Sequence, residues 1–113
     1  MSDRLPSGLV VSALLKRVND AGGIGMVLAK GDAQAGGILV LVQERDGAPR
    51  FLERGLGPDG AARLIQTGPG DAADPLQSAD YWQRRRARDP DLWVIELDIA
   101  GAERFAAETI LGR

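Results

Sequence analysis

Three segments of the chain are predicted to be helices, from their apolar spacing and from the residues at their ends. The first begins at Ser7, which is suited to cap a helix, and ends in the glycine-containing residues 19–23. The second begins at Ser78 and ends at Asp89, because a following proline disfavours helical backbone. The third covers residues 102–111. The apolar positions that define the first and third helices are Val10, Val11, Leu14, Leu15 and Val18, and Phe105, Ala106 and Ile110.

Other segments have the patterns of strands. Residues 38–42, ILVLV, form an unbroken apolar run, which predicts a central strand covered on both faces. A shorter strand is predicted over residues 24–29, and a return strand begins at Phe51 after a turn at residues 46–47. Residues 61–67 fit either a fourth strand or a short helix.

The last predicted strand covers residues 92–99 and alternates in polarity. Its alternation predicts that Trp93 lies in the core, while Glu96 and Asp98 lie on the solvent face of an exposed edge strand. The resulting order is helix, three-stranded meander, an unassigned link, helix, strand and helix. This order is typical of a single α+β domain over residues 1–113, with a mainly antiparallel sheet of four to five strands and two to three helices.

Composition narrows the possible chemistry. The chain has 113 residues, no cysteine and no histidine, so disulfides, thiolate nucleophiles and the commonest zinc ligands and general bases are excluded. The net charge of −2 gives no overall attraction to polyanions. We predict no cofactor and no catalytic residue. Charged residues interrupt the N-terminal apolar segment, and no run reaches the ~18 residues of a membrane helix, so we expect a cytoplasmic chain with no membrane partner.

Two patterns near the N-terminus resemble sites but have structural interpretations. Gly22, Gly23 and Gly25 follow a helix and precede a strand, which reverses the order of a phosphate-binding loop. They are interpreted as a helix end and a loop. Ser12 and Lys16 are one helical turn apart, as a nucleophile and its base would be, but Lys16 lies on the polar face, where it stays charged.

Acidic residues gather around the last strand. Carboxylates alone can hold Mg²⁺ or Ca²⁺. However, Asp89 and Asp91 flank a proline turn, where aspartate is common, and Glu96 and Asp98 fit a solvated strand face. We therefore predict no metal site.

Four arginines within residues 84–88 form the most conspicuous charged feature. They point around a helix rather than along one stripe, and acidic residues follow them directly, which disfavours a contact with nucleic acid. The predicted local pairs are Arg84 with Asp80, Arg85 with Asp89, and Arg86 with Trp82. The candidate interaction surface consists of Arg84, Arg85, Arg86, Arg88 and Trp82.

The same region carries a resemblance to a known family. Residues 84–98, RRRARDPDLWVIELD, resemble the C-terminal signature of a small bacterial family known as domain of unknown function 1491. The segments SGLVVSALLKRVNDAGG and AGGILVLV resemble its other two blocks in order and spacing, whereas residues 55–73 diverge. The resemblance implies a stand-alone bacterial cytoplasmic domain without an assigned activity, and it assigns no site residue.

These observations favour a non-catalytic interaction or regulatory module, with an unknown protein partner or self-association as a homodimer. One alternative is binding of nucleic acid or another polyanion through Arg84, Arg85, Arg86 and Arg88. A further alternative is a small-ligand binder or an enzyme that uses Asp and Arg side chains in a cleft.

Overall fold

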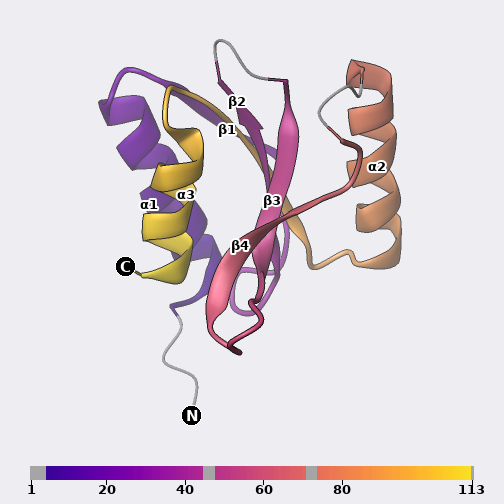
Figure 1. Ribbon diagram of the computed structural model, residues 1–113, viewed down its shortest axis with the longest axis horizontal. Coiled ribbons are helices and arrows are strands. Elements are labelled where there is room, and N and C mark those ends of the chain that lie inside the picture. Colours follow the sequence, from indigo (N-terminus) through magenta and orange to yellow (C-terminus); the bar gives the residue numbers. More distant parts are fainter. Residues whose placement is uncertain (1–4, 45–47, 71–73, 113) are drawn as a thin grey trace.

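A five-stranded sheet lies between two helices on one face and a single helix on the other (Figure 1). The computed structural model describes residues 5–44, 48–70 and 74–112. Its architecture confirms the predicted α+β class, and residues 62–67 form a strand rather than a helix. In chain order the elements are α1 (Ser7–Asp20), β1 (Ile24–Ala29), β2 (Ile38–Gln43), β3 (Arg50–Leu56), β4 (Ala62–Thr67), α2 (Pro75–Arg88), β5 (Trp93–Asp98) and α3 (Ala102–Leu111).

The strand order in the sheet is β1-β5-β2-β3-β4, so the last strand of the chain lies between the first two. β5 is antiparallel to β1 and parallel to β2, and the remaining pairs are antiparallel. The predicted meander of the first three strands is therefore wrong, because β5 separates β1 from β2. The meander consists of β2, β3 and β4. β5 is also an interior strand rather than an edge, because it pairs with β1 on one side and with β2 on the other.

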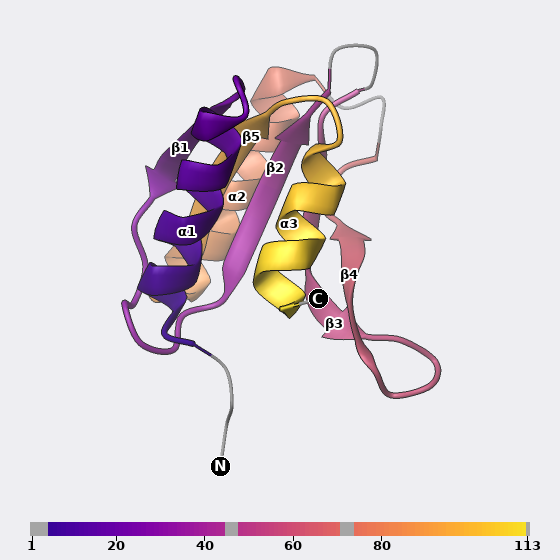
Figure 2. The ribbon, with the colours of Figure 1, turned by 90° about the vertical axis from the view of Figure 1, so that its left-hand side faces the viewer.

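Two apolar cores lie on the two faces of the sheet. Figure 2 shows α1 and α3 side by side over one face, with α2 behind the sheet. β2 contributes to both cores: Val40 and Val42 face α1 and α3, and Leu39 and Leu41 face α2. The prediction of a central strand covered on both faces is confirmed. Trp93 is 6% exposed in the core under α1 and α3, so its predicted burial is also confirmed.

The helix α1 begins with a cap that differs from the prediction. Pro6 occupies the cap position, and the Ser7 side chain makes no capping bond. Instead the Ser7 hydroxyl donates to the carbonyl oxygen of Gly36 (2.5 Å). Two carbonyl oxygens of the loop that leads to β2 also accept hydrogen bonds from the Ser7 and Gly8 N–H groups. This loop therefore satisfies donors that a capping side chain would otherwise satisfy.

The helix α2 begins at Pro75, one turn before the predicted start at Ser78. Asp74 caps it, because its carboxylate accepts the Gln77 N–H (2.8 Å) and the Gln77 side chain accepts the Asp74 N–H (3.0 Å). Ser78 is buried inside the helix instead of capping it. The predicted end is correct, since Asp89 is the C-terminal cap. The predicted turn at residues 46–47 and residues 71–73 of the link lie outside the described residues.

The 30–37 loop packs tightly against the turn that precedes β5. The Asp32 N–H donates to the Asp91 carbonyl oxygen (2.9 Å), and the Trp93 indole N–H donates to the Asp32 carbonyl oxygen (2.7 Å). A β-carbon added at Gly31 or Gly36 would overlap the Asp91 carbonyl oxygen. Glycine is needed at these positions because the two backbones approach so closely. The DPDLWV segment thus has a structural role: it locks β5 into the sheet.

We predict that Gly36→Ala destabilises the protein by about 1–3 kcal/mol, because the new methyl group must displace the Asp91 backbone. Chemical denaturation measures this loss. Gly70→Ala is the matched control: no atom of the described residues lies within 4 Å of its added β-carbon, so its effect stays within about 0.5 kcal/mol. Equal losses in the two variants would show that the contact between loop and turn is not tight.

Candidate interaction surface

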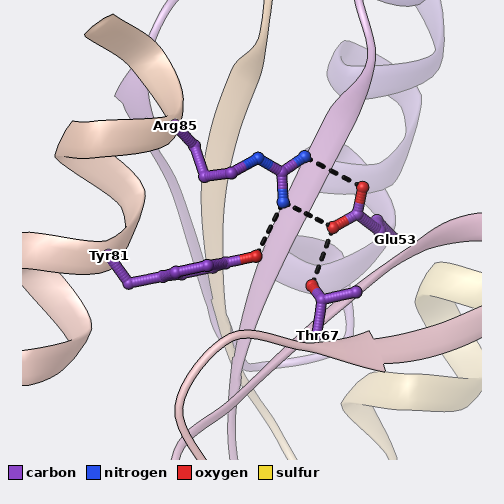
Figure 3. Close-up of polar contacts among 4 residues, drawn as sticks. All are labelled: Glu53, Thr67, Tyr81 and Arg85. Atoms are coloured by element: carbon purple, nitrogen blue, oxygen red, sulfur yellow. Dashed lines mark hydrogen bonds and ion pairs between the residues drawn. The ribbon is translucent and has the colours of Figure 1, made fainter. Parts of the chain in front are cut away.

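A polar network joins α2 to the edge of the sheet. Figure 3 shows Arg85 of α2 facing Glu53 of β3, with Tyr81 below Arg85 and Thr67 below Glu53. The two guanidinium nitrogens donate to the two carboxylate oxygens of Glu53 at 2.7 and 3.0 Å. Arg85 also donates to the Tyr81 hydroxyl (2.6 Å), and the Thr67 hydroxyl donates to Glu53 (2.7 Å). The two-point geometry is the strong form of this ion pair.

The network fixes the charges of its two ionic members. The hydrogen bonds from Arg85 hold the pKa of Glu53 below its usual value, against the opposing effect of burial, and the Thr67 hydroxyl adds to the lowering. The hydrogen bond to Glu53 in turn raises the pKa of Arg85. At neutral pH Glu53 is therefore an anion whose two oxygens already accept hydrogen bonds. Such a group is unsuited to remove a proton from a substrate.

The network also attaches a helix that has little apolar contact of its own. Ser78 is the only buried residue of α2 among those described. Tyr81 packs on Phe51 with ring centroids 4.9 Å apart, and Tyr81 and Trp82 lie against the second core. Two aromatic side chains and one ion pair thus hold α2 on the sheet. We call Glu53, Thr67, Tyr81 and Arg85 the latch.

The arginine run divides between the latch and solvent. Arg84 pairs with Asp80 at 3.0 Å as predicted, with both side chains largely exposed. The other two predicted pairs are wrong. Arg85 reaches across to β3 instead of pairing with Asp89, and it lies over the Tyr81 ring at 5.7 Å, whereas Arg86 donates to the Pro90 carbonyl oxygen instead of stacking on Trp82. Arg88 is exposed and has no partner among the residues that the structure describes.

The other candidate residues occupy structural positions. Ser12 is exposed, and Lys16 forms an exposed ion pair with Asp20 (3.0 Å). Gly22 has φ of +92° at the end of α1, where glycine is favoured. Asp89 accepts the Asp91 N–H in the turn before β5. Within residues 5–44, 48–70 and 74–112, no group of three or more acidic side chains is placed to hold a metal ion.

A patch of the sheet beside α2 is left uncovered. Glu96 and Asp98 alternate with buried residues and share a face with Val94, which belongs to the core under α2. Met26 and Ile24 pair with Glu96 and Asp98 across β1 and β5, so they lie on the same face. Ile24 is 58% and Met26 47% exposed. Neither acid has an ion-pair partner in the described part of the chain. We call these four residues the acidic patch.

The exposed side of α2 is apolar and basic, and its charge is therefore complementary to that of the acidic patch. Leu76 is 81% exposed, the Arg84 side chain is 74% exposed, and Arg88 is exposed. Figure 2 shows α2 on the opposite side of the sheet from α1 and α3. The acidic patch lies on the same side as α2, because it shares its face with Val94. An apolar and basic surface on α2 therefore lies on the same side of the sheet as an apolar and acidic one.

Sequence reasoning missed both the latch and the acidic patch. Glu53 and Arg85 are 32 residues apart, and no local pattern links them. The available signal was the helical spacing of Ser78, Tyr81 and Arg85, which places Arg85 on the buried side of α2. The sequence pattern places Glu96 and Asp98 on the solvent face of an edge strand, where exposed acidic residues are common. It therefore does not indicate the acidic patch.

Comparisons with known proteins agree with this fold. Residues 5–107 match the family described as a protein of unknown function, DUF1491, which confirms the resemblance seen in the sequence. A crystal structure of a DUF1491 family protein from Caulobacter crescentus CB15 is similar, with 32% identity, a TM-score of 0.75, and coverage of 90% of this chain and 94% of the other. The solution structure of protein Atu0922 from A. tumefaciens has 32% identity, a TM-score of 0.67, and coverage of 85% and 86%. No curated protein matches the sequence.

We predict that Arg85→Gln lowers the free energy of unfolding by about 1–2 kcal/mol, because it removes charge-assisted hydrogen bonds from a half-buried carboxylate. Arg84→Gln is the control on the neighbouring residue. It removes an exposed pair worth about 0.3–0.5 kcal/mol. Urea denaturation of both variants measures the difference. Equal losses would show that the latch does not hold α2.

The latch also predicts a pH dependence. Because the pKa of Glu53 is lower in the folded state than its ordinary value near 4.5, the stability it contributes is complete above that pH. It is lost as the pH falls through the folded-state pKa. We expect the stability difference between the wild type and Glu53→Gln to stay constant from neutral pH to about 5 and to shrink below about 4.5. A difference that is unchanged at pH 3 would contradict the assigned ion pair.

Proposed function

This chain belongs to the DUF1491 family of unknown function, and we propose that it is a non-catalytic interaction module that binds a second copy of itself. The acidic patch is the observation that carries the proposal. Natural sheets rarely leave large apolar side chains open next to an edge without protection. Here Ile24 and Met26 are half exposed beside two acids that have no ion-pair partner within the described residues, and β1 itself contains no charged residue. The opposite edge strand, β4, carries Arg63, Gln66 and Thr67.

A second copy fits this surface because the two complementary surfaces lie on one face of the molecule. A two-fold axis places α2 of each copy against the acidic patch of the other, so every contact is made twice. Leu76 then supplies apolar area to Ile24 and Met26. Arg88 supplies a positive charge to Glu96 and Asp98, which lack partners among the described residues of their own chain. Both the apolar and the ionic groups are matched in such a dimer.

The two alternative functions have less support. For nucleic-acid binding, Arg85 is used in the latch and Arg86 on the chain's own backbone, and Glu96 and Asp98 lie on the same face. For an enzyme, the latch brings polar groups together in a half-buried place, but its carboxylate is held as an anion by its own partners. A regulatory role would depend on the identity of the partner, so the proposal is restricted to an interaction module.

The predicted location also stays a prediction. None of the helices in the described part of the chain combines the length and hydrophobicity that crossing a bilayer requires. We propose a cytoplasmic location on the sequence pattern alone.

We predict that the wild type forms dimers at high micromolar concentration and that Met26→Lys weakens them at least about tenfold, because a charge replaces apolar area at the centre of the contact. Sedimentation velocity over a concentration series measures this. Leu9→Lys is the control, because Leu9 is an apolar residue of α1, 54% exposed, on the opposite side of the sheet from the patch. A wild type that stays monomeric throughout would overturn self-association.

A charge exchange identifies the surface that faces the patch. We expect Glu96→Arg to weaken the dimer, and Arg88→Glu combined with it to restore part of the affinity, because the ion pair is rebuilt with reversed signs. If the double variant is no tighter than Glu96→Arg alone, α2 is not the element that covers the patch.

A further inference from the structure

A groove opens on the face of the sheet that carries α1 and α3. It has a volume of about 890 Å³ and lies between the start of α1 and the end of α3, with parts of β2 and β3 and the 30–37 loop in its lining. Figure 2 views this face, with both helices in front of the sheet. Pockets that hold small molecules have volumes of roughly 300–1,000 Å³. The groove is therefore large enough for a ligand, and it lies on the opposite side of the sheet from the acidic patch.

Much of the groove lining is aliphatic. Val10 of α1, Ile38 of β2, and Ile110 and Leu111 of α3 are half-buried and line it, and Leu5 is exposed in the lining. Ile38 and Ile110 also pack on the core beneath. The groove thus presents a continuation of the apolar core to solvent. An aliphatic chain placed there would gain about 25 cal/mol for each Å² of apolar surface buried.

One charged side chain is directed toward this groove. Glu53 and Arg54 are neighbours on β3, so their side chains point to opposite faces of the sheet. The Glu53 carboxylate faces Arg85 of α2, which places Arg54 on the face of the groove. Arg54 is exposed and has no ion-pair partner within the described residues.

The hydroxyl groups in the lining already have partners. The Ser7 hydroxyl donates to the Gly36 carbonyl oxygen, and the Thr109 hydroxyl accepts a hydrogen bond from Arg17 (2.6 Å). The polar side chains that remain available in the lining are the carboxamide of Gln34 and the guanidinium of Arg54, which carries the positive charge. The guanidinium favours a planar, two-oxygen anion such as a carboxylate.

We propose that this groove binds an aliphatic monocarboxylate of medium chain length. Its carboxylate pairs with Arg54, and its chain lies along Val10, Ile38 and Ile110. This proposal does not depend on the proposed dimer, because its residues lie on the other face of the sheet.

The test uses decanoate, with decanol as a probe that has the same chain and no charge. Two-dimensional NMR of the labelled full chain locates each probe, and titration gives its affinity. We expect decanoate to shift the signals of Val10, Ile38 and Ile110 and to bind at least about tenfold more tightly than decanol. Equal affinities for the two probes, shifts that map to the acidic patch instead, or no binding would each overturn the proposal.

Two variants separate the specific contact made by Arg54 from a general effect of positive charge on the affinity for decanoate. Arg54→Gln is expected to weaken decanoate about tenfold or more while leaving the affinity for decanol unchanged. Arg63→Gln is the matched control, because Arg63 pairs with Gly55 and so lies on the opposite face of the sheet from Arg54. It should leave both affinities unchanged. If Arg63→Gln weakens decanoate as much as Arg54→Gln does, the attraction is a general effect of charge and the groove is not the site.

Discussion

The insertion of β5 between β1 and β2 is the constraint on which the rest of the structure depends. A strand from the end of the chain must enter between two strands from its beginning, and it pairs with both along their length. The turn before it is fixed to the 30–37 loop by the backbone hydrogen bond from Asp32 to Asp91 and by the hydrogen bond from the Trp93 indole to the Asp32 carbonyl oxygen. Carbonyl oxygens of the same loop accept hydrogen bonds from the first N–H groups of α1. One loop therefore joins the first helix to the last strand, and residues 89–94, DPDLWV, serve this junction.

The placement of β5 leaves the two faces of the sheet unequally covered. α1 and α3 cover one face, whereas α2 alone covers the other (Figure 1). The latch and two aromatic side chains attach α2 to the sheet. One helix is too narrow for five strands, which lie about 4.8 Å apart. The uncovered part falls on β1 and β5, where Ile24 and Met26 meet Asp98 and Glu96. The acidic patch is thus a consequence of topology, and it gives the molecule a surface that a partner can cover.

The elements could be predicted from the sequence more fully than their arrangement. The continuous apolar run of β2 and the alternation from Trp93 onward identified a central strand and a buried tryptophan, because burial leaves a local pattern. The position of β5 could not be predicted, since pairing partners distant in the chain leave no such pattern. Arg85 illustrates the same limit. Its predicted partner was the nearby Asp89, but the structure pairs it with Glu53 on a strand that local spacing does not reach.

The central claim is that α2 of one copy covers the acidic patch of another. Isotope-filtered NMR on an equal mixture of labelled and unlabelled chains tests it most directly, because it detects only contacts between copies. The claim predicts cross-peaks between the Met26 methyl group of one copy and the Leu76 methyl groups of the other, since these are exposed apolar residues of the two surfaces. Cross-peaks that instead join β1 to β1, or none at concentrations where dimers are present, would contradict it.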